Sequence, residues 1–223
     1  MSAKPPNPPE PPRPAPGPGR PKDLAKRAAI LDAAARMFTR HGFEGASMDQ
    51  IAAEAAVSKL TVYSHFGDKE TLFGDALRLV CASLMPDDLF VPDPSAPLRS
   101  QLTGIARAYF SMITSEEALS MHRMMMSSSG NERVRHMLWE AGPQRTQGAF
   151  ATLLQARAAQ GELDLPDVPR AARQFFALLK GDLHTRLACG LCQRPGDDDV
   201  EAHLSATVDM FLRAYARGDQ RGT

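Results

Sequence analysis

Six side chains that lie close together in the sequence have the chemistry needed to contact nucleic acid. Amines and polar tips bind phosphate oxygens, while hydroxyl and apolar groups can contact base edges in a groove. The six residues are Lys59, Leu60, Thr61, Tyr63, His65 and Lys69. They can act together only if an exposed helix presents most of them to a duplex, so the surrounding elements decide the interpretation.

The local sequence predicts such a helix and two others that hold it. Ser47 begins a capping-box pattern for a helix over residues 48–55, and Ser58 can cap the next helix, over residues 59–66. Before them, apolar residues at steps of three and four predict a longer helix over residues 23–40. Two short helices joined by a tight turn and braced by a third indicate a helix-turn-helix, whose second helix enters the major groove.

A long run of residues in this region carries a family resemblance. The run comprises Gly42-Phe43, Ser47, Ile51-Ala52, Ala55, Val57-Ser58-Lys59-Leu60-Thr61-Val62-Tyr63-Ser64-His65-Phe66 and Asp68-Lys69-Glu70-Thr71-Leu72-Phe73. In this order it resembles the DNA-binding domain of the tetracycline-repressor (TetR/AcrR) family, over about residues 23–80. The resemblance implies a homodimeric transcriptional repressor that binds double-stranded operator DNA and is released from it by a small molecule.

The family pattern also implies which residues contact DNA. They are Lys22, Lys26, Ser47, Lys59, Thr61, Tyr63, His65 and Lys69. Leu60 stands where a small or polar residue is more usual, so the base-reading role of that position is open. Structural alternatives exist too: Tyr63 could pack on the first helix with only its hydroxyl exposed, His65 could cap the helix end, and the lysines could be solvated.

Charge and composition restrict the class of protein. Lys+Arg and Asp+Glu each total 26, which excludes a uniformly basic nucleic-acid binder but allows one basic face. Three cysteines are too few for a disulfide scaffold, and the sequence has neither a signal-peptide pattern nor an apolar run long enough to span a membrane. We therefore expect a cytoplasmic protein with no membrane partner.

The chain divides into three parts by composition. Residues 1–22 form a proline-rich basic arm that we expect to be disordered, either inert or in contact with DNA. Residues 23–67 form the helix-turn-helix domain, and residues 68–223 a larger helical domain for ligand binding and dimerisation. No period-two strand pattern competes with the helical periodicity, so the predicted fold class is all-α.

The larger domain is predicted to contain seven helices separated by glycine and proline breaks. The first begins at Asp68 and continues to about Met85, and a linker loop follows over residues 86–97. The remaining helices are expected over residues 98–114, 116–127, 131–141, 143–160, 169–189 and 197–217.

A methionine-rich and aromatic group of residues in this domain predicts an adaptable apolar pocket. The candidate ligand-binding residues are Tyr109, Phe110, Met121, His122, Met125, Met137, Trp139 and Phe150. Any one methionine could equally be core filler between helices. Segments such as Trp139-Glu140-Ala141-Gly142-Pro143 and Leu178-Leu179-Lys180-Gly181 also resemble the AefR-like branch of the family. We expect an apolar or aromatic ligand, with His122 and Arg123 available for one polar group.

Two apolar stripes near the C-terminal end predict a dimer interface built from four helices. The stripe residues are Phe175, Phe176, Leu179 and Leu183 on one helix and Leu204, Val208, Phe211 and Leu212 on the next. The alternative use of these residues is packing within one chain.

Other chemistry has weak support in the sequence. Cys189 and Cys192 form a C-x-x-C pair, but no second pair completes a zinc site and no βαβ context suggests a redox motif. No phosphate-binding loop, dinucleotide fingerprint or nucleophile elbow occurs, so we predict no enzyme, cofactor or metal. A ligand-independent or activating regulator of the same fold, or a helical small-molecule-binding protein that does not bind DNA, stays as an alternative.

Overall fold

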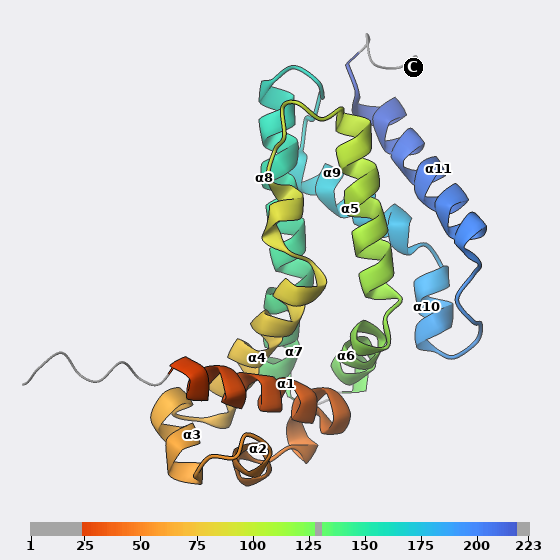
Figure 1. Cartoon of the computed structure of the whole chain (residues 1–223). Helices are drawn as coiled ribbons and strands as arrows, with labels where there is room; N and C mark the ends of the chain where they lie inside the picture. Colours follow the sequence, from red (N-terminus) through yellow and green to blue (C-terminus); the bar gives the residue numbers. More distant parts are fainter. Residues whose placement is uncertain (1–23, 128–130, 218–223) are drawn as a thin grey trace, which may run out of the picture.

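The structure is a computed structural model that describes residues 24–127 and 131–217. Within these residues it consists of helices, with one isolated antiparallel bridge between Leu163 and Ala216 and no strand, so the predicted all-α fold class is confirmed. The helices are α1 (Leu24–Gly45), α2 (Met48–Glu54), α3 (Lys59–Phe66), α4 (Lys69–Leu84), η1 (Asp87–Phe90), α5 (Leu98–Ile113), α6 (Glu116–Ser127), α7 (Glu132–Trp139), η2 (Glu140–Gln144), α8 (Arg145–Ala159), α9 (Val168–Lys180), α10 (Leu183–Ala188) and α11 (Asp197–Tyr215). Figure 1 shows α1 to α3 grouped at one end of an elongated helical body.

The predicted helix starts in the N-terminal group are present with their caps. The Ser47 side chain accepts the N–H of Gln50 while the Gln50 side chain accepts the N–H of Ser47, which completes the capping box of α2. The Ser58 hydroxyl accepts the N–H of Thr61 at 3.1 Å at the start of α3. Asp68 caps α4 in the same way, through Thr71.

The first helix is longer than the sequence predicted. Instead of ending near residue 40, α1 reaches Gly45 across a kink at Gly42, whose φ of 71° suits glycine. The added turn buries Phe43, which packs on Phe38 and edge-on against Phe73 of α4. The kink therefore adds an aromatic contact that fastens α1 to α4.

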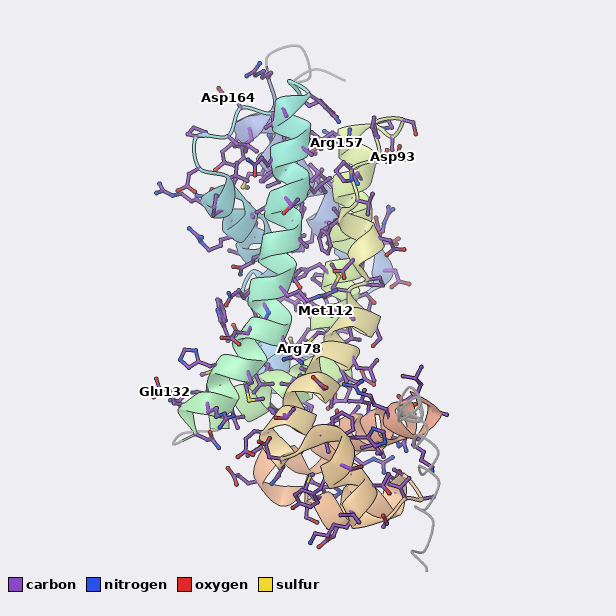
Figure 2. The ribbon with its side chains drawn as sticks, turned by 90° about the vertical axis from the view of Figure 1, so that its left-hand side faces the viewer. Arg78, Asp93, Met112, Glu132, Arg157 and Asp164 are labelled. Atoms are coloured by element: carbon purple, nitrogen blue, oxygen red, sulfur yellow. The ribbon has the colours of Figure 1, made fainter. Side chains whose placement is uncertain are left out.

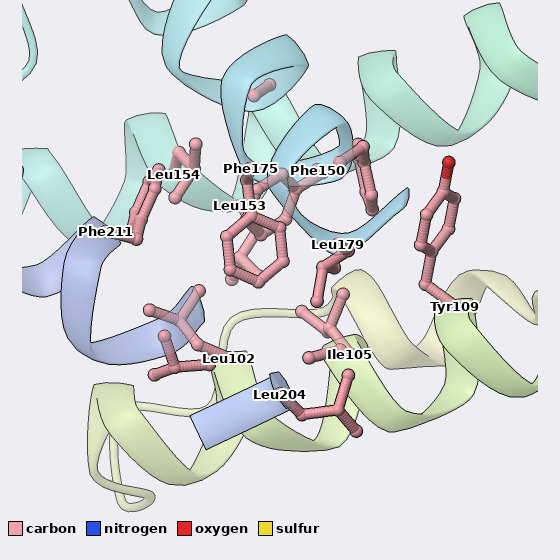
Figure 3. Close-up of a cluster of buried hydrophobic side chains, with 14 of the residues drawn as sticks. Leu102, Ile105, Tyr109, Phe150, Leu153, Leu154, Phe175, Leu179, Leu204 and Phe211 are labelled. Carbon is pink, nitrogen blue, oxygen red and sulfur yellow. The ribbon is translucent and has the colours of Figure 1, made fainter. Parts of the chain in front are cut away.

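Helix α4 connects two apolar cores. The lower core joins α1, α2, α3 and α4 to α7, with Phe38, Ile51, Phe73, Cys81 and Leu138 among its buried residues. The upper core begins at Met85 and joins α5, α8, α9 and α11. Its residues in Figure 3 include Leu102, Ile105, Tyr109, Phe150, Leu153, Leu154, Phe175, Leu179, Leu204 and Phe211. Helix α4 thus packs in the lower core, and its C-cap residue Met85 enters the upper one. The predicted boundary between residues 67 and 68 stays a prediction.

Two further predicted helix limits are wrong. A break was expected at Gly142-Pro143, but the helix continues from α7 into α8 through the π-helical turn η2, which accommodates the proline. Conversely, the single helix predicted over residues 169–189 is divided into α9 and α10 at Gly181, whose φ is 51°. The proline-rich loop also contains a short helix, η1, which buries Phe90.

A buried arginine ties that loop to the upper core. Arg157 is 1% exposed and donates to Glu162 at 2.8 Å, to Gln101 at 2.7 Å and to the backbone carbonyl of Asp93 at 2.7 Å. Figure 2 shows Arg157 and Asp93 together at the end of the body far from α1. Each nitrogen of the guanidinium group thus donates to at least one acceptor, as a buried cation requires.

None of the helices over residues 24–127 and 131–217 has the length and apolarity needed to cross a bilayer. The proline-rich arm lies outside the described residues, so its predicted disorder stays a prediction.

Candidate nucleic-acid interface and cavity

The turn between α2 and α3 fixes which side of α3 faces outward. Ala56 has a φ of 52°, a conformation that turns the chain sharply, and the N–H of Val57 donates back to the carbonyl of Ala52. On α3, Val62 and Phe66 are buried in the lower core, whereas Leu60 is 79% and Tyr63 41% exposed. The helix therefore presents an outward face, as a recognition helix must.

Polar groups at the start of α3 have partners within the chain. The Lys59 ammonium lies 2.9 Å from a carboxylate oxygen of Asp49 on α2, which raises the pKa of Lys59, and both side chains are exposed. The Thr61 hydroxyl lies 2.8 Å from the Ser58 hydroxyl. DNA bound here would compete with Asp49 for Lys59.

The remaining predicted DNA contacts lie around this face. His65 is half-buried beside the Phe66 ring, and its Nδ1 is buried without a hydrogen-bond partner. The Lys69 ammonium lies 4.5 Å from the centroid of the Phe43 ring, a cation–π contact that orients it at the start of α4. Ser47 is exposed at the start of α2, and Lys26 is exposed on α1. Lys22 lies outside the described residues.

A second candidate site is a cavity of about 120 Å³ located between the two cores. On the same measure one water needs about 10–15 Å³, so a small organic molecule fits. Seven helices and the π turn supply its walls: Cys81 and Leu84 from α4, Tyr109, Met112 and Ile113 from α5, Ala118, Met121 and His122 from α6, Leu138 from α7, Gly142 and Pro143 from η2, Thr146 from α8, Lys180 from α9 and His184 from α10. Of the residues predicted from sequence, Tyr109, Met121 and His122 line it.

The polar groups of the cavity gather around Lys180. The rings of His122 and His184 lie edge to face with centroids 4.8 Å apart. Burial, followed by the positive charge of Lys180, lowers the pKa of both histidines, that of His184 to about 4. Burial also lowers the pKa of the Lys180 ammonium and raises that of the Tyr109 phenol. This part of the wall is polar, whereas most of the remaining wall is apolar.

The other predicted ligand residues lie elsewhere. Phe110 and Phe150 are buried in the upper core, and Met137 packs against the lower core beside Gly74. Trp139 is 44% exposed and lines a surface groove that shares Tyr109, Pro143, Thr146 and Lys180 with the cavity. The side chain of Met125 lies outside the described residues. Arg123, considered for a polar contact, instead pairs with Glu116 at 2.7 Å.

The residues predicted to form a dimer interface are mostly buried within the single chain. Leu183 is partly buried, and the other seven, Phe175, Phe176, Leu179, Leu204, Val208, Phe211 and Leu212, are at most 8% exposed. They therefore fill the upper core, which was the alternative use of these stripes. The outward faces of α9 and α11 instead carry other residues, including Ala177, Ala206 and Met210.

The cysteine pair gains no partners from the fold. Cys189 is exposed and Cys192 half-buried after α10, and both are free thiols. In the part of the chain that the structure describes, no group of three or more His, Cys, Asp or Glu side chains is placed to hold a metal ion.

A three-helix group with an outward-facing α3, joined through α4 to a helical body that contains a cavity, defines a helix-turn-helix transcription regulator. Sequence comparison agrees. Residues 30–76 match the family described as bacterial regulatory proteins, tetR family, and residues 100–217 match the AefR-like transcriptional repressor, C-terminal domain.

Individual relatives are consistent with these matches. The HTH-type transcriptional regulatory protein RaaS of Mycobacterium tuberculosis is 30% identical over 73% of this chain and 71% of its own length. The HTH-type transcriptional repressor SCO4008 of Streptomyces coelicolor is 38% identical over 29% of this chain, a match that spans 37% of its own length.

Solved structures share this fold over most of the chain. A structure titled as a putative TetR-family regulator from Mesorhizobium loti is 26% identical with a TM-score of 0.76, covering 88% of this chain and 99% of that one. The flavonoid-responsive regulator FrrA is 32% identical with a TM-score of 0.74, covering 86% of this chain and 97% of that one. The chain belongs to the TetR family of bacterial transcription regulators.

Proposed function

We propose that the protein is a homodimeric repressor that binds operator DNA through α3 and is released when a small apolar ligand occupies the cavity between the two cores. One observation carries the proposal: Cys81 and Leu84 of α4 form part of the cavity wall, and α4 also holds the DNA-binding helices through the lower core. A ligand there contacts the helix on which the position of α3 depends.

The DNA-binding part rests on the outward face of α3. Leu60 and Tyr63 are exposed for contact with a groove and with phosphates. Lys59 supplies charge at the start of α3 and Lys69 at the start of α4. Ser47, Thr61, His65, Lys26 and Lys22 complete the proposed contacts. Two copies of α3 in one dimer would enter successive major grooves, about one helical turn apart.

Release requires two arrangements with different affinities for the ligand. A ligand shifts the equilibrium only if it binds the DNA-incompetent arrangement more tightly. Because the cavity lies at the junction of two separately packed cores, filling it can tilt α4 and the lower core relative to the upper core. That tilt changes the distance between the α3 helices of the two subunits. Successive major grooves can be entered only when this distance stays within narrow limits.

The kind of ligand is suggested by the cavity wall and by one relative. Met112, Ile113 and Leu138 provide apolar surface, and the relative FrrA is named as responsive to flavonoids, which are aromatic compounds.

The dimer is proposed on family grounds, with the outward faces of α9 and α11 as the contact. Light scattering at micromolar concentration should give twice the mass of the chain.

The decisive experiment measures the release of DNA by compounds, in the wild type and in a variant whose cavity is filled by a larger side chain. A fluorescent duplex from the region upstream of the reading frame should be retained specifically, and more weakly as salt rises. A panel of hydrophobic compounds should then release it and change the emission of Trp139, whose groove shares residues with the cavity. Ala118→Phe, which fills the cavity, should keep DNA binding but lose release.

The matched control is Ala159→Phe, at an exposed position near the end of α8. This variant should respond as the wild type does. If Ala118→Phe is released by the same compounds at the same concentrations, the ligand acts elsewhere and the proposed site is wrong. A duplex that is not retained at any salt concentration contradicts the repressor itself.

A further inference from the structure

One part of the cavity wall brings together three nitrogen-bearing side chains from three different helices. His122 comes from α6, Lys180 from the last turn of α9, and His184 from α10. The two rings are 4.8 Å apart, and the charge of Lys180 acts on both of them. The break at Gly181 creates this cluster, because it ends α9 at Lys180 and redirects the chain so that His184 faces His122.

Lys180 lacks a counter-ion in the part of the chain that the structure describes. No carboxylate lies within ion-pair distance of it, and burial alone accounts for the lowering of its pKa. The elements packed around it contribute no acidic group to the cavity: α4 offers the Cys81 thiol, α5 the Tyr109 phenol and α8 the Thr146 hydroxyl. Arg157, which is fully buried, has by contrast Glu162 and several further acceptors.

A partly buried ammonium without an anion is energetically unfavourable, and a ligand can relieve that cost by supplying the anion. We infer that the ligand of this cavity is an apolar organic acid, whose one oxyanion lies against Lys180 with His122 and His184 as flanking hydrogen-bond donors and whose apolar body lies along Met112, Ile113 and Leu138. This assignment deepens the proposed function by naming the ligand class, and it rests on that proposal only for the consequence on DNA.

The histidines suit this role when the cavity is empty and when it is filled. With their pKa values lowered, both rings are neutral at neutral pH, so the empty cavity holds one positive charge rather than three. Each neutral ring keeps one N–H donor for an oxyanion. A bound anion favours the protonated ring, so ligand binding should raise the pKa of both histidines and strengthen as the pH is lowered.

The test uses two fluorescent probes of nearly the same shape that differ in charge. Anilinonaphthalene sulfonate carries one sulfonate, and phenylnaphthylamine lacks it. Both are titrated into the full-length wild type and into Lys180→Met, Lys180→Arg and Arg186→Met. Arg186 is the matched control because it is an exposed cation on α10 that pairs with Asp182 outside the cavity.

We expect the wild type to bind the sulfonate probe more tightly than the neutral probe. Lys180→Met should weaken the sulfonate probe at least about tenfold while changing the neutral probe by less than about twofold, since one charged hydrogen bond is lost. Lys180→Arg should restore the preference, and Arg186→Met should leave both affinities unchanged. An unaltered ratio in Lys180→Met, or no saturable binding of either probe to the wild type, overturns the inference.

Competition identifies the form of the oxyanion. Naphthoate should displace the sulfonate probe more effectively than the uncharged naphthalenemethanol, and nitrophenolate at about pH 8 tests a phenolate in place of a carboxylate. Equal displacement by naphthoate and naphthalenemethanol also contradicts the inference.

Operator release is measured separately with the same compounds. If charge selectivity depends on Lys180 but DNA is not released, the anion site stands and the proposed release mechanism fails. If neutral and anionic compounds release DNA equally and the Lys180 variants do not differ, release stands and the anion site fails.

Discussion

The face of α3 and the cavity hold their cations in opposite ways. On α3, Lys59 is exposed and already paired with Asp49, and the Ser58 hydroxyl caps the helix and is hydrogen-bonded to the Thr61 hydroxyl. In the cavity, Lys180 is partly buried and lacks a counter-ion among the described residues. The DNA-binding face must exchange internal contacts for external ones, whereas the cavity gains a contact that it did not have.

This difference determines what each region contributes to the stability of the unbound protein. Exposed pairs contribute little, because solvent screens them and ordering long side chains is unfavourable. An uncompensated buried charge destabilises the unbound protein but makes the site selective for its counter-ion. Replacing the cavity cation should therefore raise stability and weaken ligand binding. On α3, a substitution should lower both stability and DNA binding only where it removes a helix cap.

The largest expected effect distinguishes Arg157, a buried cation paired with Glu162, from Lys180, a partly buried cation without a counter-ion among the described residues. Arg157→Met should lower the free energy of unfolding by about 3–5 kcal/mol, because Glu162 and the loop carbonyls lose their partner. Lys180→Met should leave stability unchanged or raise it. Urea unfolding followed by circular dichroism measures both. A loss of several kcal/mol in Lys180→Met would show that the ammonium has a stabilising partner.

The next largest effect concerns pH. The pKa of His184 falls from 6.5 to about 4 on folding, so between these values the unfolded chain binds more protons and stability falls as the pH is lowered. Each unit of the shift corresponds to about 1.4 kcal/mol. His184→Gln should reduce the loss of stability between about pH 7 and about pH 5, measured by urea unfolding at each pH.

His136→Gln is the control for the pH experiment, because His136 is exposed on α7. The control should retain the acid sensitivity of the wild type. Equal sensitivity in His184→Gln and the wild type would mean that His184 titrates at its ordinary pKa in the folded protein.

A smaller effect tests whether Asp49 competes with DNA for Lys59. Asp49→Asn should strengthen operator binding a few-fold at low salt, because Lys59 is released and a negative charge near the phosphates is removed.

Lys69→Ala should instead flatten the salt dependence of operator binding by about one unit of slope if Lys69 neutralises one phosphate. Fluorescence anisotropy over a salt series measures both, and an unchanged slope removes Lys69 from the contacts.

The smallest effect concerns the exposed hydroxyl on α3. Tyr63→Phe should weaken binding by about 1 kcal/mol on every operator variant, because we assign the hydroxyl to a phosphate rather than to a base. Thermal unfolding should not change, since the hydroxyl is not part of the lower core. Loss of preference at a single base pair would instead assign Tyr63 to base recognition.

The helix-turn-helix could be predicted from sequence because its determinants are local. Each cap, at Ser47, Ser58 and Asp68, acts within three residues of itself, so the residue types alone identify it. Only the extent of α1 differed, since burial of Phe43 against Phe73 is a tertiary effect that extends the helix beyond a glycine.

The cavity could be predicted only in part because its walls come from helices distant in the sequence. The methionine-rich group indicated α6 and α5 correctly, through Met121 and Tyr109. Lys180 and His184 lack such a local signal, since the sequence pattern predicts one continuous helix over residues 169–189, whereas the structure breaks it at Gly181. Similarly, Phe110 and Phe150 have the composition expected of a pocket wall, but helix packing directs them into the upper core.

The continuous helix formed by α7, the π turn η2 and α8 has a consequence for how relatives could come to differ in the ligands they bind. A π turn holds one more residue than an α turn, so a lineage could gain or lose that residue without breaking the helix. Losing it would rotate α7 by about 100° relative to α8 and carry Leu138 away from the cavity wall, while the upper core kept its packing. One-residue insertions and deletions at this position would thus change the cavity wall and the packing of α7 in the lower core together, while the upper core stayed constant.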